Sequence, residues 1–196
     1  MNTVSTQSEV ATAKPRGPGR SFKGLLWSLV PIVVVVSLLV LWQRGSASPV
    51  LSVDPAPDVA YAQRVSPVPL PAPGPLPGTW RSTSSNVDAP NSDPTQPDQP
   101  KRSPVTLTIG YLTEDDHFAE VVVGDRSATG LLTQAEPGAT KDGDVMVGPV
   151  RWDTYRNQRG EQVLVGTVGE AGVLVTGDAS GTDLVALAAS LRLPAA

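Results

Sequence analysis

The sequence predicts an α+β protein in which an N-terminal transmembrane helix precedes an antiparallel β-sheet domain with one or two packing helices. Three observations lead to this class. An uncharged apolar run lies near the N-terminus, short segments that alternate apolar and polar residues fill the second half, and the last segment places its leucines at helical spacing.

The apolar run extends from Gly24 to Trp42 and contains no charged residue. About twenty residues at a helical rise of about 1.5 Å each cross the hydrocarbon core of a bilayer. Four basic residues lie just before the run, whereas only Arg44 follows closely. The positive-inside rule therefore places residues 1–23 in the cytoplasm as a basic tail. We expect a single-pass protein of the cell membrane whose C-terminal part is extracytoplasmic.

A cleaved signal peptide is the alternative, because Ser46, Ala47 and Ser48 offer small residues at a plausible cleavage distance. Two observations favour an uncleaved helix. The apolar run is longer than the roughly 7 to 15 residues of a signal-peptide core, and Pro49 directly follows the best cleavage position.

Fourteen of the 20 prolines lie between Pro49 and Pro104, which predicts extended or irregular chain there. Residues 43–58 are expected to be a proline-rich spacer. The run Pro67–Pro77 must be extended, either as free polyproline or laid against the domain. The polar residues 86–102 resemble a disordered insertion, because they include no large apolar side chain.

The folding signals lie in residues 103–193. Residues 105–109 alternate apolar and polar side chains, residues 113–116 form a turn, and residues 117–123 are apolar and β-branched, which predicts a hairpin. Further strands are predicted at 145–155, broken near Gly148, and then at 162–168 and 171–176, as in an antiparallel meander of about four to six strands.

Two helices are predicted to pack on a face of this sheet. At the C-terminal end, Ser180 and Asp183 have the spacing of a capping box. Leu184, Leu187, Ala188 and Leu191 then share one helical face. Residues 126–134 predict a second, shorter helix, although Gly130 lowers its helix propensity.

Several short motifs follow one another along the chain: Tyr61–Arg64, Leu76–Ser84, Gly110–Thr113, Trp152–Arg156 and the segment from Val175 to Arg192. Their order resembles one family, the actinobacterial single-pass membrane proteins grouped as domain of unknown function 4245 (DUF4245). The resemblance implies an extracytoplasmic domain over residues 59–196, with a short helix around Tyr61 and a strand around Trp80. It implies no biochemical activity. A looser likeness, in architecture only, is to small exported domains of the Mog1/PsbP type, many of which act in binding or assembly.

Composition excludes several classes of function. The chain contains no cysteine, which removes disulfides, thiolate metal sites and cysteine nucleophiles. Residues 1–44 contain five basic and one acidic residue, and the remainder contains ten basic and eighteen acidic residues. Nucleic acid is therefore not an expected partner, because its phosphates need clustered cations. No phosphate-binding glycine loop or cofactor motif is present, and no cofactor is expected.

Candidate catalytic residues are few. His117 is the single histidine and has Asp115 and Asp116 beside it, but no nucleophile motif accompanies it. The segment Lys141–Asp144 lacks the later ligands of a calcium loop and predicts an ordinary turn. A pair of glycosidase-type carboxylates remains open, and the candidates are Glu114, Glu120, Asp125 and Glu161.

Trp80, Trp152 and Tyr155 are the large aromatic residues of the outer domain that we consider as a ligand platform. Aromatic side chains of this kind more often belong to the core. We expect a non-catalytic module that binds an envelope protein, an envelope polymer or a small ligand, and no metal. The alternative is an unrecognised extracytoplasmic hydrolase.

Overall fold

The structure is a computed structural model that describes residues 32–33, 52–96 and 98–194. The chain divides into two compact units, Met1–Pro49 and Val50–Ala196. Nearly all of the predicted membrane span and the whole cytoplasmic tail lie outside the described residues. None of the helices that the described residues form has the length and apolar character required to cross a bilayer.

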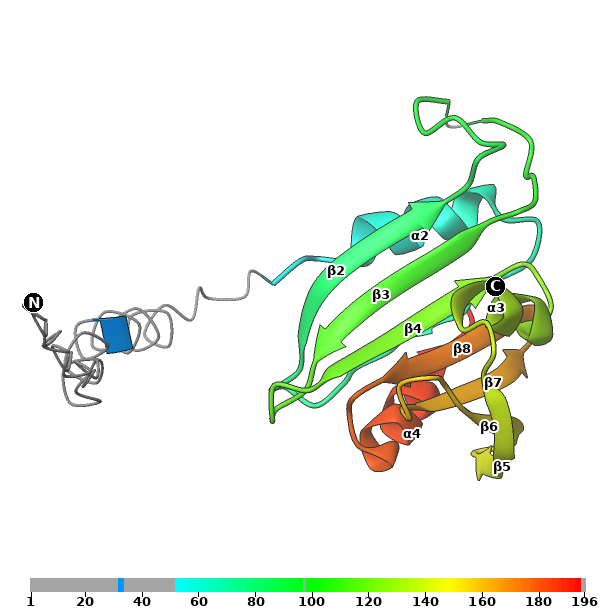
Figure 1. Cartoon of the computed structure of the whole chain (residues 1–196). Helices are drawn as coiled ribbons and strands as arrows, with labels where there is room; N and C mark the ends of the chain where they lie inside the picture. The colour runs from blue at the N-terminus through cyan, green and yellow to red at the C-terminus, as the bar shows by residue number, and fades with distance from the viewer. Residues whose placement is uncertain (1–31, 34–51, 97, 195–196) are drawn as a thin grey trace, which may run out of the picture. The chain divides into compact units, whose positions relative to one another are not determined.

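The second unit is built on one antiparallel sheet with the strand order β2-β3-β4-β8-β7-β6-β5 (Figure 1). The predicted hairpin is confirmed, because β3 and β4 pair in register from Thr106 opposite Gly124 to Leu112 opposite Phe118. The predicted meander is also confirmed in β5 to β8, whose last strand then pairs with β4. The strands are β2 (Arg81–Asp88), β3 (Thr106–Leu112), β4 (Phe118–Gly124), β5 (Thr140–Val147), β6 (Val150–Arg156), β7 (Gln162–Val168) and β8 (Ala171–Gly177).

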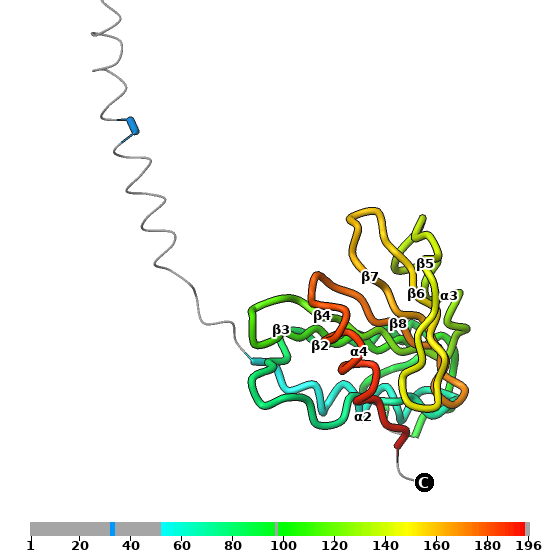
Figure 2. The backbone as a smooth tube through the Cα atoms, turned by 90° about the horizontal axis from the view of Figure 1, so that it is seen from below, coloured from blue at the N-terminus to red at the C-terminus, as the bar shows by residue number. Residues whose placement is uncertain are grey.

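Helices cover both faces of the sheet, which corrects the expectation of helices on a single face. Helices α2 (Ala56–Val65) and α4 (Gly181–Ser190) pack on the face that contains the larger core, and α3 (Ala128–Ala135) packs over β7 and β8 on the other face. Figure 2 shows α2 running along one side of β2 and β3. The physical reason lies in the central strands: every residue of β8 is buried, so both of its faces need a cover.

The predicted helix signals agree with the structure. Ser180 is the N-cap of α4, and its hydroxyl accepts a hydrogen bond from the backbone N–H of Asp183. Ser127 caps α3 in the same manner, with Gly130 as the donor. The short helix that the family resemblance implied around Tyr61 is α2, and the implied strand near Trp80 is β2, which begins one residue later.

The proline-rich run Pro67–Pro77 lies against the domain. Leu70 is fully buried, and Gln63 Nε2 donates to its carbonyl oxygen at 3.0 Å. Strand β1 (Ala72–Pro73) pairs with β9 (Leu191–Arg192) to form a separate two-stranded sheet. The run thus passes from α2 to the C-terminal end of α4. Its prolines have no backbone N–H, and the few hydrogen bonds that hold the run do not require one from them.

Two predicted boundaries differ from the structure. Helix α2 begins at Ala56, and the N–H of Val53 donates to the carbonyl of Ser82 at 2.8 Å, so the end of the 43–58 spacer belongs to the folded unit. The prediction of disorder for 86–102 is wrong for its first three residues, because they extend β2 opposite Leu107 and its neighbours. Cross-strand pairing supplies the order that the local sequence does not indicate.

The predicted turn Lys141–Asp144 is instead part of edge strand β5. Charged residues here form ion pairs with the neighbouring strand β6, which stabilises an extended conformation that the Asp-Gly-Asp sequence alone disfavours. A row of charges also discourages pairing of this edge with another chain. The pairs are Lys141 with Asp153 at 2.8 Å, Asp142 with Arg156 at 2.8 Å and Asp144 with Arg151 at 2.9 Å.

Candidate functional site

A cavity of about 560 Å³ lies where three segments meet: the residues before α2, the end of the proline-rich run and the edge of the sheet. We call it the aromatic cavity. Its prolines fix part of the wall, because their φ angles are restricted before any ligand binds. The lining residues are Ser52, Val53, Asp54, Pro55, Pro73, Gly74, Leu76, Pro77, Gly78, Trp80, Ser82 and Tyr111.

Trp80 and Tyr111 form the aromatic part of the cavity. Their ring centroids are 6.3 Å apart and the rings are inclined by 55°, within the range of favourable aromatic pairs. Tyr111 lies on β3 directly opposite Ser82 of β2, so the sheet register brings it next to Trp80. Burial raises the pKa of Tyr111 to about 12, so its hydroxyl, like that of an ordinary tyrosine, is protonated at neutral pH and can donate a hydrogen bond.

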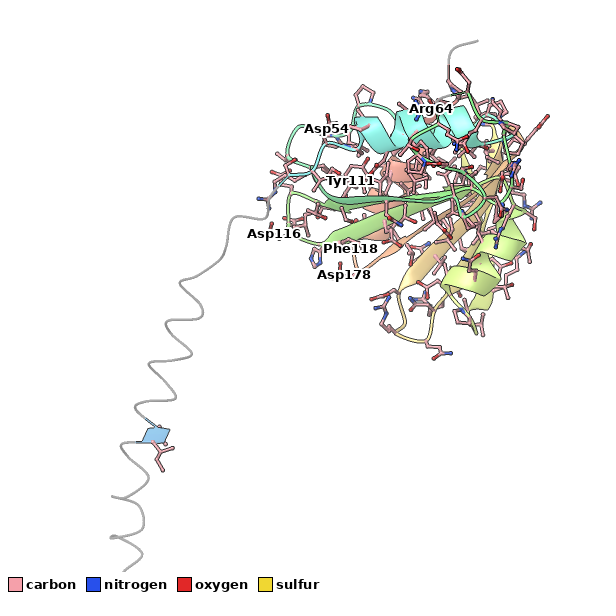
Figure 3. The ribbon with its side chains drawn as sticks, turned by 90° about the horizontal axis from the view of Figure 1, so that it is seen from above. Asp54, Arg64, Tyr111, Asp116, Phe118 and Asp178 are labelled. Carbon is pink, nitrogen blue, oxygen red and sulfur yellow. The ribbon has the colours of Figure 1, made fainter. Side chains whose placement is uncertain are left out.

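The polar groups of the aromatic cavity are hydroxyls and one carboxylate. Asp54 is exposed, and its Oδ1 accepts from the N–H of Ala56 at 3.0 Å, which fixes the side chain at the start of α2. Figure 3 shows Asp54 at this end of α2 and Tyr111 on the sheet below the helix. Ser82 Oγ is buried and has no hydrogen-bond partner among the described residues. No lysine, arginine or histidine contributes to the lining.

The structure separates the three aromatic residues singled out in the sequence. Trp80 is partly buried in the aromatic cavity, Trp152 is 1% exposed in the larger core, and Tyr155 packs on the opposite face beside the α3 cluster. Tyr111 was missed as the partner of Trp80. Strand alternation could have placed it on the same face as Ile109, but its pairing with Ser82 depends on the β2 register.

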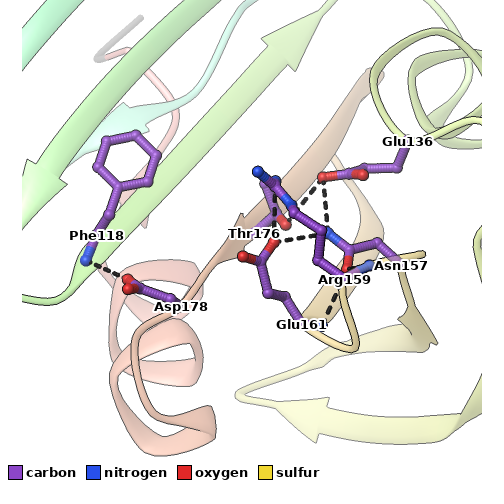
Figure 4. Close-up of polar contacts among 7 residues, drawn as sticks. All are labelled: Phe118, Glu136, Asn157, Arg159, Glu161, Thr176 and Asp178. Carbon is purple, nitrogen blue, oxygen red and sulfur yellow. Dashed lines mark hydrogen bonds and ion pairs between the residues drawn. The ribbon is translucent and has the colours of Figure 1, made fainter. Parts of the chain in front are cut away.

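A second polar cluster lies on the α3 face, where Glu136 at the end of α3 meets the loop between β6 and β7 (Figure 4). Glu136 Oε1 accepts from Thr176 Oγ1 and from Asn157 Nδ2, both at 3.3 Å. Glu161 accepts from Asn157 Nδ2 at 2.8 Å and pairs with Arg159 at 2.9 Å. These carboxylates therefore hold the loop to the helix and the sheet.

Glu120 of β4 lies beside this cluster and is partly buried. Burial raises the pKa of its carboxyl, and the negative charge of Glu136 raises it further, whereas Arg159 lowers it. The aromatic cavity and the three other prominent cavities of the described domain include neither of these glutamates among their lining residues. Glu120 and Glu136 are close enough to interact, but neither lines any of these four cavities.

The other proposed catalytic groups do not converge. His117 Nδ1 lies 3.7 Å from Asp178 Oδ2, with both side chains more than half exposed, and Asp178 accepts from the N–H of Phe118 at 2.6 Å (Figure 4). Glu114 lies in the turn between β3 and β4, whereas Asp125 follows β4 at the opposite end of that hairpin. Ser103 and the N–H of Val105 donate to Asp125, which gives it a structural role.

These features define a small α+β domain with a two-sided antiparallel sheet and an aromatic cavity at one edge. Within the described residues, no group of three histidine or acidic side chains is placed to hold a metal ion. Residues 19–191 match the family described as a protein of unknown function, DUF4245, so the chain belongs to that family. This match confirms the family resemblance. A comparison with functionally curated proteins finds no match.

Proposed function

We propose that this chain is a membrane-anchored extracytoplasmic binding module and that the aromatic cavity is its ligand site. Residues 24–42 would cross the membrane once and residues 1–23 would lie in the cytoplasm. The aromatic cavity is formed in part by residues 52–55, soon after the proposed membrane helix. The ligand would thus be a component of the cell envelope.

The observation that supports this function most directly is the Trp80–Tyr111 pair within a cavity that contains hydroxyls, one carboxylate and no cationic side chain. Aromatic rings offer flat apolar surfaces, and a few fixed polar groups select the orientation of a ligand. A sugar ring has this combination of an apolar C–H face and peripheral hydroxyls. We therefore propose that the ligand is a neutral sugar segment of an envelope polymer. Phosphate-rich ligands would find no positive charge in this cavity.

The alternative function, a hydrolase, would depend on Glu120 and Glu136. Burial and mutual repulsion raise the pKa of Glu120, as a general acid requires, which is the specific observation in its favour. Glu136 would then have to act as the second carboxylate while it accepts hydrogen bonds from Thr176 and Asn157. We favour the binding module, because the aromatic pair lines one of the four described cavities and the glutamates line none of these four.

The test is binding of neutral and anionic pools of envelope polysaccharide to the full-length protein in detergent. We expect the wild-type protein to retain the neutral pool. Trp80→Leu should bind this pool about tenfold more weakly than wild type, and Asp54→Asn should also bind it more weakly, since each substitution removes a cavity contact. Phe118→Ala is the matched control, because Phe118 is 37% exposed and lies outside the cavity. Equal binding by all four proteins would reject the aromatic cavity as the site. Cleavage of the polymer that disappears in Glu120→Gln would establish the hydrolase instead.

A further inference from the structure

A second cavity, of about 430 Å³, lies at the C-terminal end of α4, and we call it the C-terminal groove. The turn between β5 and β6 forms one side, and the end of α4 with strand β9 forms the other. Its lining is mainly apolar and includes Val147, Val150, Val168, Leu191 and Leu193. Leu193 is 46% exposed, so apolar surface remains open to solvent at this groove.

Trp152 contributes to the lining of the C-terminal groove and has an unusual polar atom. Its side chain is 1% exposed, yet Nε1 has no hydrogen-bond partner among the described residues. Buried donors are nearly always paired, because an unpaired N–H loses its water without compensation. The protein itself therefore leaves this donor without an acceptor in a residue that lines the groove.

Arg192 adds positive charge to the same groove. Its Nη1 donates to the carbonyl oxygens of Ala189 at 2.7 Å and Leu191 at 2.8 Å, which fixes the guanidinium at the C-terminal end of α4. Among the described residues, Nη2 and Nε of this arginine make no hydrogen bond or ion pair. A guanidinium with two unused donor positions is well suited to a carboxylate.

We propose that the C-terminal groove binds one fatty-acid-type molecule, a single acyl chain with a free carboxylate. The acyl chain lies along the valine and leucine side chains, where its burial is favourable. The carboxylate is held by Arg192, and Trp152 Nε1 supplies a second donor to the head of the ligand. This site is separate from the aromatic cavity, with which it shares no lining residue.

The charge at the groove favours an anionic amphiphile over the alternatives. A cationic amphiphile would meet the guanidinium of Arg192 with the wrong sign, and a neutral alcohol would gain one hydrogen bond in place of a charged pair. A water molecule at Trp152 Nε1 would satisfy the donor but would leave the apolar wall without a partner.

The experiment uses dodecanoate with a diazirine on its terminal carbon, added to full-length protein in its native membrane. Irradiation is followed by peptide mapping of the crosslinks. We expect labelling of the peptides that contain Val147–Trp152 and Leu191–Leu193, and competition by plain dodecanoate at least about tenfold better than by dodecyltrimethylammonium or dodecanol. Absence of labelling in these peptides would overturn the proposal. Labelling only by a diazirine-bearing phospholipid would likewise reject a free acid as the ligand.

Two substitutions test the head-group contacts. Arg192→Gln should weaken competition by dodecanoate about tenfold, whereas Arg151→Gln, an exposed arginine paired with Asp144 outside this groove, should leave it unchanged. Trp152→Phe removes the N–H and retains most of the ring. We expect weaker binding together with a modestly lower melting temperature of the unliganded protein, because the smaller ring leaves a cavity in the core although no internal hydrogen bond is lost. Unchanged binding in both Arg192→Gln and Trp152→Phe would show adventitious partition of the probe and overturn the proposal.

Discussion

The indole of Trp152 lies directly on the backbone of Gly166 in the neighbouring strand. A Cβ atom at Gly166 would be 2.7 Å from Trp152 Cδ2 and 2.8 Å from Cε3, closer than side chains pack in proteins. The absence of a side chain at Gly166 thus allows the largest residue of the core to lie flat on the sheet. This contact also sets the position of the indole beside the C-terminal groove.

Gly166→Ala should destabilise the domain Val50–Ala196 by about 1 to 3 kcal/mol, because the added methyl group must displace the indole in a close-packed core. Urea unfolding of the full-length protein measures this change. Gly78→Ala is the matched control, since a Cβ at Gly78 has no neighbour within 4 Å, and its stability should change by less than about 1 kcal/mol. Equal stability of the two variants would contradict the packing argument.

Trp152→Ala should lower the free energy of unfolding by about 3 to 5 kcal/mol, because the residue is buried in the larger core, to which the strands and α4 contribute. His117→Ala should stay within about 0.5 kcal/mol, since the imidazole is 54% exposed. The same His117 variant should retain ligand binding. If it instead abolished an activity while melting normally, His117 would be the starting point of a catalytic mechanism.

Glu120 predicts a pH dependence of stability. Burial, with a smaller contribution from Glu136, raises the folded-state pKa of Glu120 above its value in the unfolded chain. The folded domain therefore binds this proton more tightly, and its stability falls as the pH rises through the folded-state pKa. Glu120→Gln removes this loss. Its melting temperature relative to wild type should rise as the pH is increased above about 4.3, the pKa of an ordinary glutamate, and a constant difference would show that Glu120 does not titrate differently on folding.

The loop after β2 should tolerate shortening. Replacing residues 92–100 with a short Gly/Ser bridge retains Asp88 at the end of β2 and the contact from Arg102 N–H to the Val65 carbonyl. Doubling or halving a loop changes its closure free energy by only about 0.6 kcal/mol. A cooperative melting transition near that of the full chain is the expected result. Loss of that transition would assign the loop to the folding core.

Membrane topology can be tested with fused reporter proteins that are active in only one compartment. A reporter that is active only outside the cytoplasm should function when fused after Ala196, and one active only inside should function at the N-terminus. The membrane-bound mature protein should retain residues 1–44. A mature N-terminus near Pro49 would establish a cleaved signal peptide, and the reversed reporter pattern would reject the proposed orientation.

Local signals predicted much of the fold. The alternation in 105–109 and 117–123 identified the β3–β4 hairpin, and Ser180 with Asp183 identified the start of α4. What local signals could not provide was pairing between distant segments. The polar residues of β2 form a strand because they pair with β3. The Asp-Gly-Asp segment of β5 is extended because it forms ion pairs with β6.

The candidate site was less predictable, since it depends on long-range register. Trp80 was singled out as an aromatic residue, but its neighbour Tyr111 is brought close by the pairing of β2 with β3 and by the return of the proline-rich run. The role of Asp54 was also hidden, because the residues before α2 read as a spacer. A backbone hydrogen bond from Val53 to β2 helps to order these residues, and such a bond leaves no mark in the sequence.

That hydrogen bond, from the N–H of Val53 to the carbonyl of Ser82, gives the domain a defined mechanical attachment point. A pulling force applied through Ser52 reaches the sheet first at this bond, and the force loads a single bond before it loads the rest of β2. Val53 and Ser82 both also line the aromatic cavity. Tension on the chain before Ser52 would therefore separate two lining residues of the aromatic cavity before it unfolded any strand.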